Sequence, residues 1–140
     1  MKLQGKVAIV TGGNSGIGKG IALMFAKEGA RVCIVGRNEQ RGQDAVQQIK
    51  ALGAEGFFLK ADVGNAQDMQ MIVNKTVETY GKVDIMVNNA AIIHQAKLLD
   101  LQDDDWDLII RNNLRRVDLG SQDAAIQMVS KVHVGRIINL

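Results

Sequence analysis

The 140-residue sequence contains no proline and only one cysteine. A single cysteine excludes a disulfide within the chain, and Cys33 stands in an apolar run, where a free thiol is usually buried and unreactive. No apolar stretch approaches the roughly 20 residues that a membrane-spanning helix needs. The two histidines, His94 and His133, have no Cys, His or carboxylate partners at the spacing of metal ligands, so we expect no metal site.

The sequence also lacks an excess of charge of either sign. Its 17 lysines and arginines and 15 aspartates and glutamates leave a formal net charge of +2. Such a balance gives no reason to expect nucleic acid or a membrane as a partner. The N-terminus shows no basic-apolar-small signal pattern, so the cytoplasm is the expected compartment. With 46% hydrophobic residues, the chain suits a globular α/β protein, and we expect a single domain over residues 1–140.

A strand, a glycine-rich turn and a helix follow one another at the N-terminus. The apolar run 7–10 is typical of a buried parallel strand, and a helix is expected over 19–28. Between them, glycines at 12, 16 and 18 permit a sharp turn and a close approach of the backbone to a ligand. Because the N-terminus of a helix attracts anions, this segment predicts a site for the pyrophosphate of a dinucleotide. A glycine-rich turn that binds nothing is the alternative.

Strand and helix patterns alternate along the rest of the chain. Strands are expected near 31–35, 56–60, 84–88 and 135–140, and helices over about 39–52, 66–80 and 103–131. The alternation predicts an α/β fold, a Rossmann-type doubly wound parallel sheet of strand order 3-2-1-4-5. Ligands of such sheets bind beyond the carboxyl ends of the strands, at the switch point. Gly12, Gly36, Asp62 and Asn89 all fall at or just beyond expected strand ends, which supports a site there.

The spacing T-G-x-x-x-G-x-G over 11–18 resembles the coenzyme turn of the short-chain dehydrogenase/reductase family. Further motifs similar to those of the family recur in order: Asp62-Val63, Asn88-Asn89-Ala90-Ala91, Trp106-Asp107 with Asn113, and Gly135-Arg136-Ile137-Ile138-Asn139. The resemblance covers nearly the whole chain and implies the N-terminal, coenzyme-binding portion of a classical member. It also implies an oxidoreductase that transfers a hydride between a nicotinamide coenzyme and a carbonyl or alcohol carbon.

The end of the second expected strand bears on the choice of coenzyme. NAD sites usually place a carboxylate about 20 residues after the glycine turn, where it binds the ribose hydroxyls. Here Gly36-Arg37 stands at that point, and Arg37 can present its planar guanidinium to a 2′-phosphate. We therefore expect NADP(H), with NAD(H) as the less favoured coenzyme. A solvated surface charge is the alternative for Arg37, and Ser15 stands where a second basic residue would strengthen the case.

The resemblance assigns roles to further residues. It places Asp62 at the adenine edge, Val63 beside the ring and Asn89 near the coenzyme, whereas Asn88 looks more structural. A turn or helix-capping carboxylate is the alternative for Asp62. Ala91 replaces the usual glycine, which would be costly if its φ were positive. The full set of expected coenzyme-binding residues is Gly12, Asn14, Ser15, Gly16, Ile17, Gly18, Arg37, Asp62, Val63, Asn89 and Ala90.

The helix expected over 103–131 carries an apolar stripe at helical spacing, formed by Trp106, Ile109, Ile110, Leu114, Val117, Ala124, Ala125, Met128 and Val129. Asn113 lies on this stripe. The resemblance implies a catalytic role for Asn113, holding a water of a proton relay; an amide satisfied by backbone is the alternative. Arg116 and Asp118 stand where the family has other residues, and they would cost several kcal/mol if they were buried unpaired; exposure, or a pair between the two, is the alternative. A homo-oligomer formed through this helix is a further expectation.

In the family, a serine after the fifth strand and a tyrosine with a lysine four residues on complete the catalytic set. The sequence ends at Leu140, before that serine, and its one tyrosine, Tyr80, has Asp84 at the lysine spacing. Of these catalytic positions only Asn113 is present. We therefore expect a truncated coenzyme-binding fragment, inactive alone, whose parent acts on a small carbonyl or alcohol. A non-catalytic dinucleotide-binding module or regulator, and a degraded remnant without function, are the alternatives.

Overall fold

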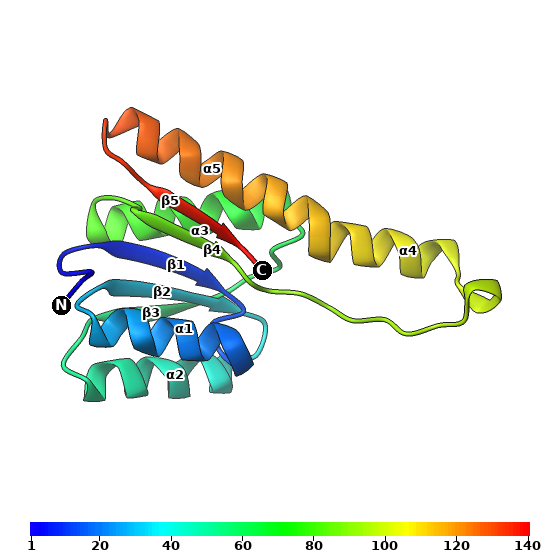
Figure 1. Ribbon diagram of the computed structural model, residues 1–140, viewed down its shortest axis with the longest axis horizontal. Coiled ribbons are helices and arrows are strands. Elements are labelled where there is room, and N and C mark those ends of the chain that lie inside the picture. The colour runs from blue at the N-terminus through cyan, green and yellow to red at the C-terminus, as the bar shows by residue number, and fades with distance from the viewer.

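The computed structural model describes residues Met1–Leu140 and shows a sheet between two layers of helices (Figure 1). The strands are β1 (Val7–Thr11), β2 (Arg31–Gly36), β3 (Gly56–Lys60), β4 (Ile85–Asn88) and β5 (Arg136–Asn139). The α-helices are α1 (Gly16–Lys27), α2 (Glu39–Ala51), α3 (Ala66–Tyr80), α4 (Asp103–Ile109) and α5 (Arg116–Ser130). A short 3-10 helix, Leu98–Asp100, precedes α4, and a π-helical segment, Ile110–Arg115, joins α4 to α5.

The strands are all parallel and lie in the order β3-β2-β1-β4-β5. This confirms the expected doubly wound Rossmann-type sheet. The direction of winding reverses between β1 and β4, because β1 pairs with β2 on one side and with β4 on the other. At such a switch point the connections leave the sheet in opposite directions and open a crevice at the carboxyl ends of the strands.

Two hydrophobic clusters fill the space on either side of the sheet. Successive residues of a strand point to opposite faces, so Ala8 and Val10 of β1 pack with residues of α1 and α2, whereas Ile9 packs with residues of α3 and α5. The central strands β1 and β2 are apolar and buried on both faces, as expected for parallel strands. This doubly covered core fixes the strand ends on which the candidate site is built.

The first turns of the helices differ in how they are capped. The side chain of Asn38 accepts a hydrogen bond from the backbone N–H of Arg41 at the start of α2, and Asn65 accepts one from Asp68 at the start of α3, both at 3.0 Å. Ser15 makes no such bond at the start of α1. The unpaired N–H groups of the first turn of α1 therefore remain available to a ligand.

The helix expected over 103–131 forms as α4, the π-helical segment and α5, and it buries only part of the predicted stripe. The buried positions follow one row of every fourth residue: Asn112, Arg116, Gly120, Ala124 and Met128. Ala124 and Met128 of the predicted stripe are buried, whereas Trp106 is 57% exposed and Val129 is 78% exposed, so the prediction was wrong for these two residues. Small residues explain why the helix buries this row against the sheet, because a Cβ at Gly120 would collide with Oδ1 of Asn88.

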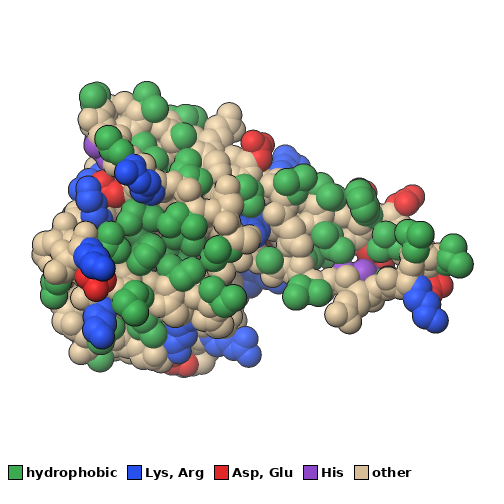
Figure 2. All heavy atoms as spheres, in the orientation of Figure 1, with side chains coloured by type: hydrophobic (Ala, Val, Ile, Leu, Met, Phe, Trp, Pro, Cys, Tyr) green, Lys and Arg blue, Asp and Glu red, His purple; other side chains and the backbone are tan.

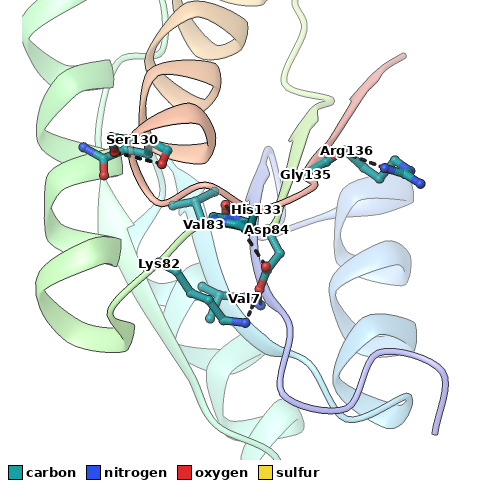
Figure 3. Close-up of polar contacts among 9 residues, drawn as sticks. Val7, Lys82, Val83, Asp84, Ser130, His133, Gly135 and Arg136 are labelled. Carbon is teal, nitrogen blue, oxygen red and sulfur yellow. Dashed lines mark hydrogen bonds and ion pairs between the residues drawn. The ribbon is translucent and has the colours of Figure 1, made fainter.

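One buried carboxylate, Asp84, connects the amino-terminal ends of the strands (Figure 3). This end of the sheet is called the amino edge below, and the opposite end, where the strands finish, is called the carboxyl edge. Its Oδ2 accepts a hydrogen bond from the backbone N–H of Val7 at 2.8 Å and lies 2.9 Å from Nζ of Lys82. Its Oδ1 lies 3.4 Å from Nε2 of His133, which also contacts the carbonyl oxygen of Val83 at 3.0 Å. Because a carbonyl only accepts, that nitrogen carries the proton. Asp84 thus links the starts of β1 and β4 to the loop before β5.

Part of the sheet and one connection lie outside the doubly covered core. α5 is the helix that packs on β4 and β5, and Figure 2 shows apolar side chains gathered on the face between α5 and α1. Ile138 of β5, which pairs with Val87, is 39% exposed. The segment after β4 and α4 itself extend away from the rest of the molecule (Figure 1). None of the helices has both the length and the apolar composition required to cross a membrane.

Candidate functional site

A cleft of about 640 Å³ opens at the carboxyl edge of the sheet. Its walls come from the segments that follow β1, β2, β3 and β4, together with Asn112 from the π-helical segment. Of the predicted coenzyme-binding residues, those that line this cleft are Gly12, Asn14, Ser15, Gly16, Ile17, Arg37, Asp62, Val63, Asn89 and Ala90. The structure therefore brings these residues, which are widely separated in the sequence, to one place.

The glycine-rich turn forms the floor of the cleft. Gly12 and Gly16 have positive φ angles of 66° and 52°, a conformation that favours glycine. A Cβ at Gly12 would lie 2.8 Å from Nδ2 of Asn89 and 3.0 Å from Cα of Ala90. The turn can therefore approach the segment after β4 closely only because residue 12 has no side chain.

Gly18, the remaining predicted glycine, lies beneath the turn and does not line the cleft. A Cβ at this position would collide with the carbonyl oxygen of Gly12 and with the Asn89 side chain. Asn14 connects the turn to β2: its side chain lies against Gly36, and its Nδ2 donates to the carbonyl oxygen of Asn38 at 3.4 Å. Gly18 and Asn14 thus fix the shape of the floor.

A threonine that the sequence analysis did not single out joins the ends of β1 and β4. Oγ1 of Thr11 donates to the carbonyl oxygen of Val87 and accepts from the N–H groups of Asn89 and Ala90, at 3.0–3.2 Å. Nδ2 of Asn89 donates back to the Thr11 carbonyl oxygen at 3.0 Å. Thr11 is the last residue of β1 and the first residue of the T-G-x-x-x-G-x-G motif, which was the sequence signal for this role.

The two asparagines at the end of β4 face different surroundings. Asn89 lines the cleft, whereas Asn88 is fully buried and donates through Nδ2 to Asn139 at 2.9 Å and to Ser121 at 3.3 Å. Asn88 thereby ties β4 to β5 and α5, in keeping with a structural residue. Ala91, also in the lining, does not have a positive φ, so its replacement of glycine stores no left-handed strain.

Two arginines lie in the cleft wall after β2. Arg37 was predicted from the sequence; Arg41, one turn into α2, was not. Neither guanidinium forms a salt bridge with an Asp or Glu of the chain. A cation in the first turn of a helix is repelled by the positive end of the helix dipole. Once the helix start at Asn38 was predicted, the unfavourable position of Arg41 was therefore a sequence signal for a ligand contact.

Asp62 follows β3 and uses only one of its carboxylate oxygens within the chain. Its Oδ1 accepts a hydrogen bond from the N–H of Gly64 at 2.9 Å, as in a turn, while its own N–H donates to Oδ2 of Asp68 at 2.8 Å. Oδ2 of Asp62 accepts no hydrogen bond from the chain, and the residue lines the cleft beside Val63. The turn interpretation and a ligand contact are therefore compatible, because they use different oxygens.

The side chain of Asn113 is held by the backbone of Ile92. Oδ1 of Asn113 accepts from the Ile92 N–H at 2.8 Å, and Nδ2 donates to the Ile92 carbonyl oxygen at 2.7 Å. The backbone satisfies both ends of this amide, which was the alternative to a water-holding role. Asn113 therefore positions the segment after β4, and Ile92 itself lines the cleft.

Arg116 and Tyr80 lie outside the cleft. Arg116 is only 2% exposed, its Nε and Nη1 have no hydrogen-bond partner, and Asp118 is exposed, so the two do not pair. Burial lowers the pKa of Arg116. Tyr80 packs against Phe57 at the amino edge, with the guanidinium carbon of Arg31 5.0 Å from its ring centre. Burial is the main cause that raises the pKa of Tyr80 to about 12.

No group of three His, Cys, Asp or Glu side chains lies together in a way that could hold a metal ion. Cys33 is buried in β2, and burial raises the pKa of its thiol to about 12. A thiol with so high a pKa is not a nucleophile at neutral pH. The chemistry available in the cleft is therefore that of free N–H groups, two guanidiniums, a carboxylate and several amides.

The fold and the cleft at its switch point are those of a Rossmann-type nucleotide-binding protein. The profile of the short chain dehydrogenase family matches residues 6–140, and the chain belongs to this family. It is 42% identical over 140 residues to an uncharacterized oxidoreductase of Thermotoga maritima, covering all of this chain and 55% of that protein. It is 44% identical over 110 residues to a 3beta-hydroxysteroid dehydrogenase of Mediterraneibacter gnavus, covering 78% of this chain and 40% of the relative.

Solved structures agree with the relatives found by sequence. A short chain dehydrogenase from Burkholderia cenocepacia in complex with NADP superposes with a TM-score of 0.91 at 38% identity, over 99% of this chain and 56% of that one. An NAD+-bound xylitol dehydrogenase superposes with a TM-score of 0.94 at 28% identity, over 99% of this chain and 54% of the other. The chain thus spans about half the length of the relatives it matches, and they include structures with either coenzyme.

Proposed function

We propose that residues 1–140 are the coenzyme-binding domain of an NADP(H)-dependent dehydrogenase or reductase acting on a small carbonyl or alcohol. The observation that carries the coenzyme preference is the pair of arginines after β2. Arg37 and Arg41 both line the cleft, both lack a carboxylate partner, and no acidic residue follows β2 directly. Two unpaired guanidiniums on one wall suit a phosphate group, which accepts their hydrogen bonds in bidentate fashion.

The floor of the cleft suits a pyrophosphate. The first turn of α1 has no side-chain cap, so its N–H groups and the positive end of its dipole face the glycine-rich turn. Gly12 lets the turn lie close against Asn89 and Ala90, where a Cβ would collide with them. Ser15, Gly16 and Ile17 line the cleft above this floor. These residues bind the central phosphates in the proposal, and Gly18 supports the turn from below.

The two halves of the dinucleotide then lie on either side of the switch point. On the side of β2 and β3, Arg37, Asp62 and Val63 face the adenosine half. On the side of β4, Asn89 and Ala90 face the nicotinamide half, and Asn113 holds Ile92 in the wall. When bound, the coenzyme supplies or accepts a hydride at C4 of its nicotinamide ring. Because the backbone of Ile92 occupies the side-chain amide of Asn113, the part that the proposal gives Asn113 in proton transfer falls to its backbone groups.

Binding measurements with both coenzymes test the preference. We expect NADPH to bind the chain at least tenfold more tightly than NADH in isothermal titration calorimetry, because a charge-assisted contact to the 2′-phosphate is worth about 1.5–3 kcal/mol. Arg37→Asp should weaken NADPH binding and narrow or reverse the preference. Arg136→Asp, which makes the same charge change at the start of β5, should leave both affinities unchanged. Equal affinities for the two coenzymes in the unmutated chain would refute the proposal.

Coenzyme binding without chemistry is a second candidate function for the 140-residue chain. It is favoured by the position of Tyr80, the only tyrosine, which packs with Phe57 and Arg31 at the opposite edge of the sheet from the cleft. With its pKa raised to about 12, this phenol is also a poor proton donor and acceptor at neutral pH. We expect the chain alone to oxidise NADPH no faster than the enzyme-free control in the presence of small aldehydes and ketones. Turnover abolished by Asn113→Ala would show that catalysis needs no further segment.

The apolar side chains exposed on α4 and α5 suit association with a second copy of the chain. Trp106 of α4, Leu114 of the π-helical segment, and Ile126 and Val129 of α5 are each more than half exposed, and exposed apolar side chains of this kind are commonly buried in protein interfaces. We propose that a homo-oligomer forms through these helical segments and buries these side chains. Size-exclusion chromatography with light scattering should show a dimer or larger assembly that Trp106→Glu dissociates, whereas Met71→Glu on α3 should not affect it.

A further inference from the structure

Asn112 is a buried asparagine in the wall of the cleft that the coenzyme motifs do not include. Its side chain comes from the π-helical segment between α4 and α5, and the residue is 7% exposed. It lines the cleft together with Asp62 and Val63. A buried amide destabilises the fold unless both its ends find hydrogen-bond partners. Whether both ends of the Asn112 amide have hydrogen-bond partners within the chain therefore decides its role.

Only one end of the Asn112 amide is bonded within the chain. Nδ2 donates to the carbonyl oxygen of Leu108 at 2.9 Å. Since a carbonyl can only accept, this contact fixes the orientation of the amide and identifies the other atom as Oδ1. Oδ1 accepts no hydrogen bond from the chain, yet it is not sealed from solvent like Oδ1 of Asn88. The free acceptor of Asn112 is therefore open to whatever occupies the cleft.

The surroundings of this acceptor indicate which part of a dinucleotide it meets. Asp62 and Val63 follow β3, on the β2–β3 side of the switch point, where the proposed function places the adenosine half. Oδ2 of Asp62 is a second acceptor without a partner in the chain. The segment that carries Asn112 lies beside Asp62, because a Cβ at Gly64 would lie 3.1 Å from Cγ of Arg111 and 3.3 Å from Oδ1 of Asp62. Two free acceptor oxygens in this part of the cleft suit a group with two N–H bonds and disfavour a carbonyl oxygen.

We propose that Asn112 recognises the 6-amino group of the adenine base, its Oδ1 accepting one of the two N–H bonds while Oδ2 of Asp62 accepts the other. The inference rests on the proposed function, because it places the adenosine half of NADP(H) beside Asp62. It makes Asn112 a specificity-determining residue for the base: a 6-aminopurine donates to both oxygens, whereas a 6-oxopurine brings a third acceptor against them. The bond from Nδ2 to Leu108 holds the amide in this orientation before the ligand arrives.

The experiment compares NADPH with its hypoxanthine analogue, reduced nicotinamide hypoxanthine dinucleotide phosphate, which differs at the 6-position of the purine. Affinities for the 140-residue chain are measured by calorimetry for the unmutated protein and for Asn112→Leu, which has a similar volume. Asn112→Ala serves as a second variant if the leucine disturbs folding, as judged by thermal melting. Asn74→Leu, an exposed asparagine of α3, is the matched control.

We expect the unmutated chain to prefer NADPH over the hypoxanthine analogue, and Asn112→Leu to weaken NADPH binding by roughly tenfold. Binding of the analogue should stay the same or become tighter, so that the ratio of the two affinities falls. A variant that weakens both ligands equally would show that Asn112 only supports the wall and would overturn the inference. A ratio of NADPH affinity to analogue affinity that stays unchanged in both Asn112 variants would also overturn the inference. If the unmutated chain binds neither nucleotide, the proposed function itself fails, and this result is distinct from a change in base preference.

Discussion

At the amino edge of the sheet the buried carboxylate of Asp84 has partners on every side, whereas at the carboxyl edge the guanidiniums of Arg37 and Arg41 have no acidic partner. Both edges are built from the same parallel strands and carry charged groups. The amino edge uses its charges to join β1, β4 and the loop before β5. The carboxyl edge leaves its charges, an Asp62 oxygen and the first turn of α1 unpaired around a cleft.

The two edges differ in whether their charged groups have partners within the chain: those of Asp84 do, whereas those around the cleft remain free for a ligand. Folding favours the pairing of polar groups that leave water, and the amino edge follows that rule. A set of unpaired donors and acceptors that converge on one hollow is better explained by a ligand that pairs with them. Asp84 and Arg41 therefore predict opposite outcomes on substitution: the first should change stability, and the second should change binding.

The largest expected effect is at the amino edge. Asp84→Ala removes the acceptor of the Val7 N–H and the partner of Lys82, and it should lower the free energy of unfolding by about 3 kcal/mol. Urea unfolding followed by circular dichroism measures this loss. Asp44→Ala on the exposed face of α2 should change stability by no more than about 0.5 kcal/mol. A loss at Asp84 no larger than at Asp44 would mean that the two edges do not differ as described.

Arg116, the first residue of α5, tests whether every unpaired charge indicates a ligand, because it is buried, lacks partners for Nε and Nη1, and does not line the cleft. Arg116→Met should raise the free energy of unfolding by about 2 kcal/mol, since an apolar side chain of similar length avoids the cost of burying a charge. The exposed neighbour variant Arg115→Met should have little effect. Destabilisation by Arg116→Met in the same urea titrations would instead reveal a partner for the guanidinium that the chain does not supply.

A smaller effect, on binding alone, is expected at the carboxyl edge. Arg41→Gln should weaken NADPH binding about tenfold through the loss of a charge-assisted contact, with NADH binding and the urea midpoint unchanged. Lys50→Gln, further along α2, makes the same charge change away from the cleft and should bind NADPH normally. If Arg41→Gln alters stability and leaves NADPH affinity intact, Arg41 belongs with the structural charges.

The smallest effect concerns Glu28, near the amino edge. Its Oε2 accepts a hydrogen bond from the Lys2 N–H at 2.8 Å, and this contact holds the pKa of the carboxyl below its ordinary value. A folded-state pKa that is lowered gives stability that is present above the unfolded pKa and is lost as the pH falls through the folded pKa. The melting temperature of Glu28→Gln should therefore lie slightly below that of the unmutated chain at pH 7 and converge with it near pH 3. A difference that grows toward acid would contradict this assignment.

Most of the architecture was predictable because it depends on local patterns. Strand order and the glycine turn follow from apolar runs, helix caps such as Asn65 and the spacing of glycines, and the structure confirms the order. The buried face of the last long helix was not predictable in the same way. There Gly120 allows close contact with Asn88, and this tertiary contact overrides the apolar stripe that contains Trp106 and Val129.

The candidate site was predictable where a residue lies just beyond the end of a strand, as Arg37 and Asp62 do. Arg41 and Asn112 were missed because they lie within helices, and only the packing of those helices turns them toward the cleft. The buried and unpaired state of Arg116 was likewise invisible, since a sequence shows neither the depth of a side chain nor its partners. Tertiary contacts, rather than local propensity, decide each of these cases.

The absence of side chains at Gly12 and Gly18 has a consequence for how such a protein can change over generations. A methyl group at either position meets the Asn89 amide and the neighbouring backbone, so this part of the cleft tolerates almost no variation. Positions 37 and 41 line the cleft with exposed side chains, which meet no comparable obstacle. Mutations that change the choice of ligand are therefore confined to a few side chains. A directed-evolution library restricted to those positions can alter the coenzyme preference without disturbing the fold.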